Sequence, residues 1–364
     1  MKILALLTDP YGAPGGIARY NTRLLSALGV LNSKPKIFAL SRAQASSAET
    51  LPSSVSCQTP PGGKAGYVFS ALALLLKESP FDFIFFGHLH CAALAAFLAR
   101  LGRAPWWLQL HGIEAWRKPT ALLRKSAERA DLVTGVSRYT RRKFLEWARI
   151  NPSKVKVLPN TVDGRFQPGP KPEHLLTRYR LKDKRILLTL SRLSSEEKYK
   201  GHDRVLSVMP ELLKKFPDLI YVVAGEGNDR ARLEARAKKE GLNRSIRFIG
   251  PVPEMELADH YRMADLFIMP STGEGFGIVF LEAAACGVPV IGGNQDGSVD
   301  ALREGQIGQA LHPHDSQGMI AGIEKALNEK QIDSRATQPF SQIHFSEGAA
   351  ALAQTLVSNV RNKN

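Results

Sequence analysis

Strand-like apolar runs alternate with helix-like stretches along almost the whole chain, and this alternation restricts the possible folds more than any other feature. Such alternation is typical of βαβ units, in which helices connect the strands of a parallel sheet. The sequence therefore predicts an α/β protein with parallel sheets. We expect strands at residues 3–8, 35–40, 81–87, 106–111, 132–137, 155–159, 186–192, 219–224, 246–249, 266–271 and 289–291.

The length of 364 residues allows two domains of ordinary size, each with its own hydrophobic core. A segment rich in proline and glycine, residues 160–181, indicates a link between two halves. We expect one domain over residues 1–165 and a second over residues 166–345.

Two glutamates eight residues apart, Glu274 and Glu282, are the strongest indication of function. The first follows the strand-like run 265–270 and is surrounded by glycines, which let the backbone approach a ligand closely. The second lies on a helix-like stretch that ends before Pro289. Because ligands of parallel sheets bind beyond the carboxyl ends of the strands, Glu274 is expected at a ligand site.

The predicted start of this helix favours an anion. The N–H groups near Phe276, Gly277 and Ile278 would face a ligand at a helix N-terminus, where the helix dipole attracts negative charge. A nucleotide diphosphate suits that position, with Gly275 in the same loop. The alternative is a surface loop with one helix-capping glutamate, which the combined glycine pattern and spacing disfavour.

This segment resembles the E-x7-E signature of retaining glycosyltransferases of the GT4 type, which have the GT-B fold. The resemblance implies two Rossmann-like domains whose parallel sheets face a central cleft, with the nucleotide sugar held mainly by the second domain and the acceptor by the first. It implies that Glu274 contacts hydroxyls of the transferred sugar and that Glu282 holds the ribose. It also implies that a final helix, residues 346–364, crosses back to the first domain.

The loop after the first strand of the second half contains Arg192 and Lys200. It resembles the family's Arg and Lys-Gly element, whose two cations bind the diphosphate, with Lys198 as a less secure alternative to Lys200. Fixed cations would stabilise the leaving group as it gains negative charge.

Three further loops match the family. Gly15 and Gly16 lie in a glycine loop that lacks G-x-G-x-x-G, so a tight turn without a ligand is an alternative. His111 ends a strand-like run and resembles the family's His-Gly loop near the transferred sugar, although a histidine there can serve structure alone. Val252 lies in the loop 250–253, where the family holds the nucleobase. The predicted catalytic residues are Glu274, Lys200, Arg192 and His111.

No metal or other cofactor is expected. The chain has no Asp-x-Asp, the arrangement with which many other glycosyltransferases hold a divalent metal. His88 and His90 flank one residue beside Cys91, and an ordinary loop explains them better than a metal site. The three cysteines are odd in number and far apart, which predicts no disulfide framework and a reducing cytoplasm.

The chain carries 49 Lys and Arg against 34 Asp and Glu, a net charge of +15. This charge permits attraction to nucleic acid, anionic lipid or acidic substrates without choosing among them. Residues 122–149 combine many basic residues with Leu122, Phe144 and Trp147, which predicts amphipathic helices with a basic face. A solvated helix face and an anionic membrane surface are equally favoured explanations. With no apolar run of about 18 residues, we expect a cytoplasmic protein, peripheral on the inner face of the membrane.

The resemblance implies a retaining glycosyltransferase, and the absence of Asp-x-Asp adds the expectation that it needs no metal. It would move a hexosyl unit from a UDP- or GDP-sugar to a saccharide or lipid-linked saccharide, in cell-surface polysaccharide or glycolipid synthesis. One alternative is a GT-B sugar-nucleotide epimerase. Another is a basic nucleic-acid-binding protein with a regulatory nucleotide site, but no basic run is interleaved with stacking aromatics, so we expect no nucleic-acid partner. The sequence of the loop 294–298 differs from the more familiar sequence of the family at this place. We expect this loop to bear on the choice of donor, but its sequence does not identify the sugar.

Overall fold

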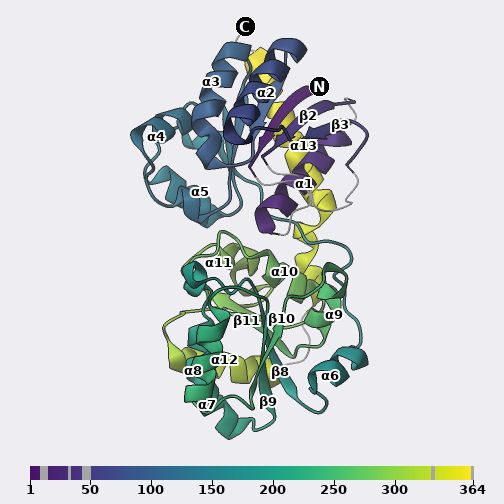
Figure 1. Cartoon of the computed structure of the whole chain (residues 1–364), viewed down its shortest axis with the longest axis vertical. Coiled ribbons are helices and arrows are strands. Elements are labelled where there is room, and N and C mark those ends of the chain that lie inside the picture. Colours follow the sequence, from purple (N-terminus) through teal and green to yellow (C-terminus); the bar gives the residue numbers. More distant parts are fainter. Residues whose placement is uncertain (9–14, 32–33, 43–50, 329–332, 362–364) are drawn as a thin grey trace. The chain divides into compact units, whose positions relative to one another are not determined.

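Two units divide the chain, and each contains one parallel sheet with helices against it (Figure 1). Unit 1 comprises Met1–Thr161 together with Gln342–Asn364, and unit 2 comprises Val162–Ser341. The last helix of the chain therefore belongs to unit 1, although unit 2 precedes it in sequence. The computed structural model describes residues 1–8, 15–31, 34–42, 51–328 and 333–361.

The sheet of unit 1 has seven parallel strands in the order β3-β2-β1-β4-β5-β6-β7. The order reverses between β1 and β4, as in Rossmann-like folds, where the chain builds outward from the centre of the sheet in both directions. The strands are β1 Lys2–Leu7, β2 Lys36–Ser41, β3 Val55–Gln58, β4 Phe83–Phe86, β5 Trp106–Leu110, β6 Leu132–Gly135 and β7 Val155–Val157.

Helices bury both faces of this sheet, which explains why its central strands are mostly apolar on both faces. On β4 and β5, Phe85 packs against Trp107 on one face, with ring centroids 5.6 Å apart. Their neighbours Phe86 and Trp106 pair on the opposite face at 5.8 Å. The helices are α1 Gly16–Gly29, α2 Gly63–Glu78, α3 Ala92–Gly102, α4 Ala121–Ala127, α5 Arg138–Leu145 and α13 Gln342–Arg361, with 3-10 turns η1 Leu89–Cys91, η2 Ile113–Ala115 and η3 Pro152–Lys154.

The sheet of unit 2 has six parallel strands in the order β10-β9-β8-β11-β12-β13, reversing between β8 and β11. Its strands are β8 Arg185–Leu190, β9 Leu219–Ala224, β10 Ile246–Gly250, β11 Leu266–Met269, β12 Val290–Gly293 and β13 Gln309–Leu311. The helices are α6 Glu173–Tyr179, α7 His202–Lys215, α8 Arg230–Lys239, α9 Leu257–Arg262, α10 Ile278–Ala285, α11 Ser298–Ala301 and α12 Ser316–Asn328, with η4 Ser195–Lys200, η5 Glu254–Glu256, η6 Arg303–Gly305 and η7 Ser334–Phe340.

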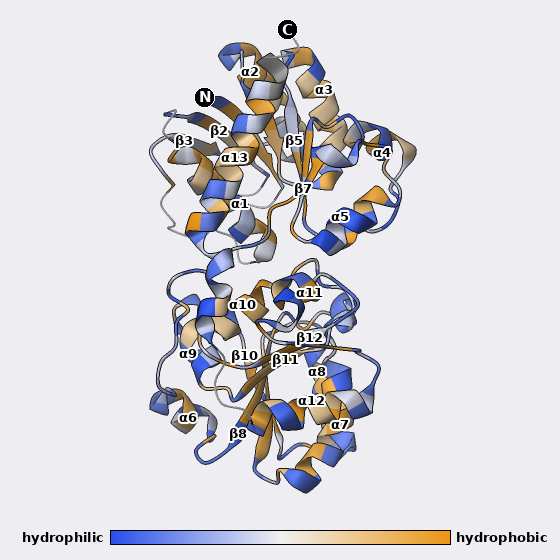
Figure 2. Cartoon of the chain, turned by 180° about the vertical axis from the view of Figure 1, so that it is seen from behind, coloured by the Kyte–Doolittle hydropathy of each residue, from blue (hydrophilic) through white to orange (hydrophobic). Residues whose placement is uncertain are grey.

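The core of unit 2 also lies on both sides of its sheet (Figure 2). Apolar residues of α7, α8 and α12 pack against one face. On the other face, Tyr261 of α9 and Phe280 of α10 each pack against Phe267 of β11, at 5.7 and 5.8 Å between ring centroids. The predicted α/β fold with two Rossmann-like parallel sheets is therefore confirmed.

The strand predictions missed only β3 and β13 among the described strands. Both lie at the edge of a sheet, and neither is a continuous apolar run: β3 reads Val-Ser-Cys-Gln and β13 reads Gln-Ala-Leu. An edge strand is covered less completely than a central one, so its sequence need not be apolar throughout. In the part of the chain that the structure describes, no helix is both long enough and apolar enough to cross a membrane.

Helix α13 is expected to contribute strongly to the stability of unit 1. Phe345 on this helix is 4% exposed and packs edge-on against Tyr20 of α1, with ring centroids 5.5 Å apart. We predict that Phe345→Ala lowers the free energy of unfolding by about 3–5 kcal/mol, the usual effect of truncating a buried phenylalanine. Tryptophan fluorescence during urea unfolding measures this, because all four tryptophans lie in unit 1.

The matched control is Ile343→Ala on the same helix. Ile343 is 69% exposed, so its truncation should change the unfolding free energy by less than about 0.5 kcal/mol. Equal destabilisation by the two variants would contradict a packed interface between α13 and α1.

Candidate functional site

The loops after β8 and β11 meet where the strand order of unit 2 reverses. Such a reversal leaves an opening beyond the carboxyl ends of the two strands, and ligands of Rossmann-like sheets bind there. The first loop, residues 191–201, contains η4, and the second, residues 270–277, leads into α10. A backbone hydrogen bond joins them, in which the N–H of Thr272 donates to the carbonyl of Tyr199 at 3.0 Å.

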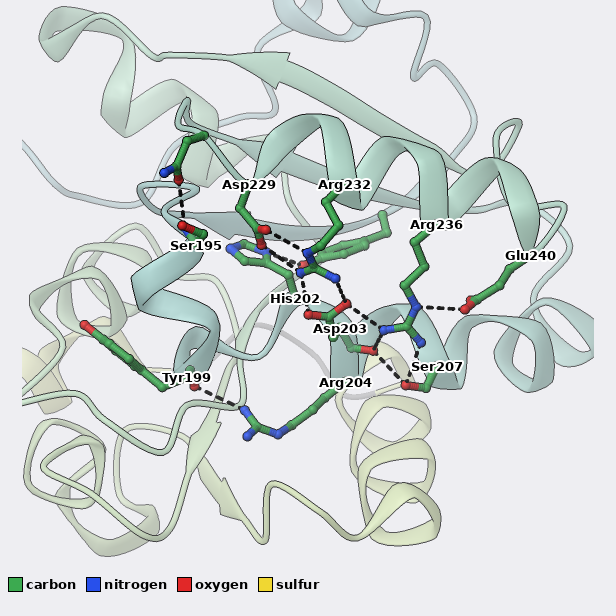
Figure 3. Close-up of polar contacts among 12 residues, drawn as sticks. Ser195, Tyr199, His202, Asp203, Arg204, Ser207, Asp229, Arg232, Arg236 and Glu240 are labelled. Carbon is green, nitrogen blue, oxygen red and sulfur yellow. Dashed lines mark hydrogen bonds and ion pairs between the residues drawn. The ribbon is translucent and has the colours of Figure 1, made fainter.

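Gly201 makes this close approach possible. Its φ is +90°, and a Cβ at this position would lie 2.5 Å from the carbonyl oxygen of Pro270. The guanidinium of Arg204 fastens the same contact, since it donates to the carbonyls of Tyr199 at 3.1 Å and Pro270 at 3.0 Å (Figure 3). The end of η4, which carries Lys200, is therefore held against the loop that carries Glu274.

Lys200 and Glu274 form an ion pair at this point, with Nζ 3.2 Å from Oε1. The ammonium of Lys200 also lies 3.7 Å from Oε2 of Glu197, so it stands between two carboxylates. The three side chains are only 13–16% exposed. The other oxygen of Glu197 accepts a hydrogen bond from the guanidinium of Arg192, whose side chain is 79% exposed. The structure thus brings three of the predicted catalytic residues, Arg192, Lys200 and Glu274, to one place.

Helix α10 begins beside Glu274. Gly277 precedes its first residue, Ile278, and no side chain among the described residues caps this end. Phe276 is 2% exposed and packs against Phe340 at 5.6 Å, which fixes the turn into the helix. One turn further along α10, Glu282 is 2% exposed and its Oε2 accepts a hydrogen bond of 2.7 Å from the hydroxyl of Tyr261.

The remaining predicted residues lie at other loops. Val252 is half-buried in the loop after β10. Gly15 and Gly16 form the start of α1 in unit 1, where nothing lies within 4 Å of a Cβ built on either residue. His111 follows β5, and its Nε2 lies 2.9 Å from the carbonyl oxygen of Gly87, so this histidine has a structural hydrogen bond at the strand end.

The histidines near β4 show no metal site. His88 precedes η1, and the ring of His90 lies 4.6 Å from the ring of His88 between centroids. Within the described residues, no group of three or more His, Cys, Asp or Glu side chains is placed to hold a metal ion.

The basic stretch 122–149 has the amphipathic character that the sequence predicts. Phe144 is fully buried, and Trp147 is half-buried with its Nε1 donating to the carbonyl of Ala115 at 2.8 Å. These rings pack into the core of unit 1, so they are not part of its exposed surface. Leu122 is 70% exposed. The exposed basic residues are Lys125, Arg129, Arg138, Arg142 and Arg149.

His202, which sequence reasoning did not single out, links the Lys200 loop to the sheet. It follows Gly201, and its Nε2 lies 2.9 Å from the hydroxyl of Ser191, the residue before Arg192. Its Nδ1 lies 3.2 Å from the hydroxyl of Tyr221, which itself donates to Thr189 at 2.9 Å. Burial, followed by the nearby charge of Lys200, lowers the pKa of His202 to about 4. In the sequence, the position of His202 two residues after Lys200 was the only indication of a role at the site. That position does not reveal that the imidazole is buried.

The next residue, Asp203, anchors the start of α7 to α8 (Figure 3). Its carboxylate accepts two hydrogen bonds from Arg232, at 2.9 and 2.7 Å, and one from Arg236 at 2.7 Å. Burial raises the pKa of Asp203, but the hydrogen bonds and charges of the two arginines prevail and lower it to about 2. Since α7 follows directly on Gly201, this network also fixes the C-terminal end of the Lys200 loop.

Two Rossmann-like parallel sheets, with an acid and a base paired at the strand reversal of the second, define the class of GT-B glycosyltransferases. Residues 177–339 match the family model described as "Glycosyl transferases group 1", and residues 14–165 match "Glycosyltransferase Family 4". The chain belongs to the GT4-type glycosyltransferases.

Relatives of known activity include the GDP-mannose-dependent alpha-(1-6)-phosphatidylinositol monomannoside mannosyltransferase of Mycolicibacterium smegmatis, which is 34% identical over 271 residues, 70% of each chain. The D-inositol 3-phosphate glycosyltransferase 2 of Catenulispora acidiphila is 30% identical over 262 residues, 67% of this chain and 61% of that protein. Among solved structures, HepE of Anabaena in complex with UDP or UDP-glucose has a TM-score of 0.80 at 20% identity, covering 98% of this chain and 100% of its own.

From the low pKa of His202 we predict how the free energy of unfolding changes with pH. The ordinary value is 6.5, so between pH 6.5 and about 4 the unfolded chain binds a proton that the folded chain does not. Unfolding is therefore favoured as the pH falls through this window. The contribution of His202 should decrease by about 3 kcal/mol between pH 7 and pH 4, since one pKa unit corresponds to about 1.4 kcal/mol.

Urea unfolding of the wild type and of His202→Gln, followed by circular dichroism at each pH, isolates this contribution. Other groups titrate in both proteins, so only the difference between them reports on His202. A difference that is constant from pH 7 to pH 4 would show that the imidazole is not buried in its neutral form.

Proposed function

We propose that this glycosyltransferase transfers a hexosyl unit from a nucleotide sugar with retention of anomeric configuration. The acceptor is a saccharide or lipid-linked saccharide, and the reaction belongs to cell-surface polysaccharide or glycolipid synthesis. The observation that carries the proposal is the Lys200–Glu274 pair at the strand reversal of unit 2, beside the uncapped start of α10. Nothing in the similarities to known proteins supports the epimerase or the nucleic-acid-binding alternative.

The proposed donor site uses the residues that unit 2 gathers there. The N–H groups at the start of α10 bind the diphosphate, which the helix dipole also favours. The carboxylate of Glu274 accepts hydrogen bonds from hydroxyls of the transferred sugar. The carboxylate of Glu282 binds the ribose of the nucleotide. The loop of Val252 lies along the nucleobase. For unit 1, the donor-binding roles of Gly15, Gly16 and His111 rest on the family resemblance alone.

In the proposed reaction, the bond between C1 of the sugar and the diphosphate oxygen breaks while C1 bonds to the acceptor oxygen on the same face. The acceptor's proton moves to an oxygen of the leaving phosphate. Negative charge grows on the diphosphate, and Lys200 and Arg192 stabilise it. Glu197 lies in contact with both cations.

The donor is proposed to be a UDP- or GDP-sugar. The Mycolicibacterium relative uses GDP-mannose, and Anabaena HepE binds UDP-glucose, so neither nucleotide is favoured over the other. A panel of UDP-, GDP- and ADP-sugars tests the proposal by thermal stabilisation and by transfer to saccharide acceptors. A donor at 100 times its dissociation constant should stabilise the protein by about 2.7 kcal/mol.

Truncation of the paired residues should impair turnover more than folding. We predict that Glu274→Ala or Lys200→Ala lowers kcat by about 10²-fold or more, as is usual when a single electrostatic stabiliser is lost. Glu282→Ala should mainly raise KM for the donor, because the ribose contact is equally strong in the ground and transition states. Steady-state kinetics on folded variants measure both effects.

Lys198→Ala is the matched control, since Lys198 is an exposed lysine on the same 3-10 segment. It should leave kcat within a factor of about two, the scale of a weakly interacting surface charge. A folded Glu274→Ala variant with the kcat of the wild type would remove the central claim.

Transfer is proposed not to need a divalent metal. The chain has no Asp-x-Asp, and Arg192 and Lys200 supply the positive charge that a metal would otherwise bring. We predict that most activity remains in excess EDTA. Activity that disappears in EDTA and returns with magnesium or manganese would overturn this proposal.

Unit 1 is proposed to bind an anionic membrane surface where a lipid-linked acceptor is found. Support comes from the exposed basic residues around α4 and α5, among them Lys125 and Arg129. Helix α3, which contacts both α4 and α2, exposes Phe97 at 55%, and α2 exposes Phe69 at 72%. Exposed basic and apolar side chains are both found in proteins that lie on anionic membranes.

Sedimentation with liposomes tests this interaction. We predict binding to vesicles with anionic lipid, weaker binding at high salt because salt screens exposed charges, and little binding to neutral vesicles. Lys125→Glu combined with Arg129→Glu should reduce binding by about tenfold or more, since each basic residue near an anionic leaflet contributes about 1 kcal/mol.

Met255→Ser is the control for apolar contacts, because Met255 is 89% exposed but lies in unit 2. Phe69→Ser should weaken membrane binding, whereas Met255→Ser should not. Equal partition of the wild type to anionic and neutral vesicles, or none to either, would favour a soluble acceptor.

A further inference from the structure

The loop between β12 and α11, residues 294–298, holds both peptide groups of Glu274. The N–H of Glu274 donates to Oδ2 of Asp296 at 2.7 Å. The carbonyl of Glu274 accepts a hydrogen bond of 2.8 Å from the N–H of Gly297. Together with the side-chain contact to Lys200, this gives Glu274 three separate points of attachment. The loop was notable in the sequence, but the contacts that it makes were not predictable.

Asp296 is a fully buried carboxylate, and hydrogen bonds satisfy it. Its Oδ2 also accepts from the hydroxyl of Ser271 at 2.7 Å, and its Oδ1 accepts from the N–H of Ser298 at 2.9 Å. In the described part of the chain no Lys, Arg or His forms an ion pair with it. Burial raises the pKa of Asp296, and these hydrogen bonds oppose the increase. Its hydrogen-bond donors are neutral groups, and Arg204 adds a favourable electrostatic interaction from nearby. Burying a charge is unfavourable unless such partners satisfy it.

The Glu274 loop is in close contact with the loop 294–298 and with the end of β12. A Cβ at Gly297 would lie 2.0 Å from the carbonyl oxygen of Gly275, and one at Gly293, the last residue of β12, would lie 1.9 Å from that of Ser271. The hydroxyls of Ser271 and Ser298 are 3.1 Å apart and fully buried. The loop 294–298 therefore contributes directly to the position of the Glu274 backbone.

We propose that Asp296 is a positioning residue for Glu274, and that the loop 294–298 thereby contributes to selection of the donor sugar. This inference rests on the proposed function, in which the carboxylate of Glu274 contacts sugar hydroxyls. Displacing a substrate-contacting group by about 1 Å can reduce turnover by about 10²-fold. Asp296 does not touch the donor in this scheme; it acts through the main chain of Glu274.

The first test is Asp296→Asn, which removes the charge and replaces one acceptor oxygen by an NH2 group. At least one of the N–H groups of Glu274 and Ser298 then loses its acceptor. We expect kcat to fall by about 10-fold to 10²-fold. Binding of the nucleoside diphosphate alone should stay within about twofold of the wild type, and the preference for the best sugar over its epimer should decrease. Asp296→Ala provides a second variant without the misplaced donor group.

The matched control is Gln295→Ala in the same loop. Gln295 is exposed, and its amide nitrogen lies 2.8 Å from Nε2 of His312 rather than near Glu274. This variant should keep the kcat and the sugar preference of the wild type. Loss of both in Gln295→Ala would show that any change in the loop has the same effect, which would overturn the specific role of Asp296.

A double-mutant cycle separates positioning from a general structural role. In a Glu274→Ala background, Asp296→Asn should change kcat by less than about twofold, because the residue through which it acts is gone. An equal loss of kcat with and without the Glu274 side chain would overturn the proposal, as would a loss of thermal stability with unchanged kcat and sugar preference.

Failure of this inference and failure of the proposed function give different results. If Glu274→Ala has the kcat of the wild type, the sugar-contact role of Glu274 is wrong and the inference falls with it. If Glu274→Ala is impaired while Asp296→Asn and Asp296→Ala match the wild type, only the inference is overturned.

Discussion

The burial of both faces of each sheet is the constraint on which the rest of this structure depends. Helices cover the sheets on both sides, so the central strands are mostly apolar, and the few polar side chains on them, such as Gln109 and Thr189, are buried and hydrogen-bonded. The charged side chains of the site converge at the loops beyond the strand ends. The reversal of strand order between β8 and β11 selects one such place in unit 2, and there the structure brings Lys200 and Glu274 together.

The sequence predicted the central strands and the principal charged residues of the site, and it failed where a contact depends on burial. Strands β3 and β13 were not predicted, because an edge strand need not be a continuous apolar run. The amphipathic pattern of residues 122–149 did not by itself decide that Phe144 is buried while Leu122 is exposed. Asp296 and His202 were missed as contact residues, because a loop sequence does not reveal that a carboxylate or an imidazole is buried among distant partners.

The charged side chains of the site pair with one another. Arg192 and Lys200 both contact Glu197, and Lys200 also contacts Glu274, so two cations face two carboxylates. At the start of α7, the carboxylate of Asp203 accepts hydrogen bonds from two arginines of α8. The neighbouring His202, whose lowered pKa favours the neutral imidazole, connects the same segment to β8 and β9. The loop 191–201, which contains η4, is therefore attached to the sheet and helices of unit 2 at several points.

The place of α13 has a consequence for how the polypeptide acquires its structure during synthesis. Unit 2 is continuous in sequence, so all of its residues are synthesised before α13. Unit 1 instead needs Phe345 of α13 to pack against α1, so a segment that it requires is synthesised only after the whole of unit 2. Domains generally fold as units during synthesis. The second half of the sequence is therefore complete as a folding unit before the first half, although the first half is made earlier.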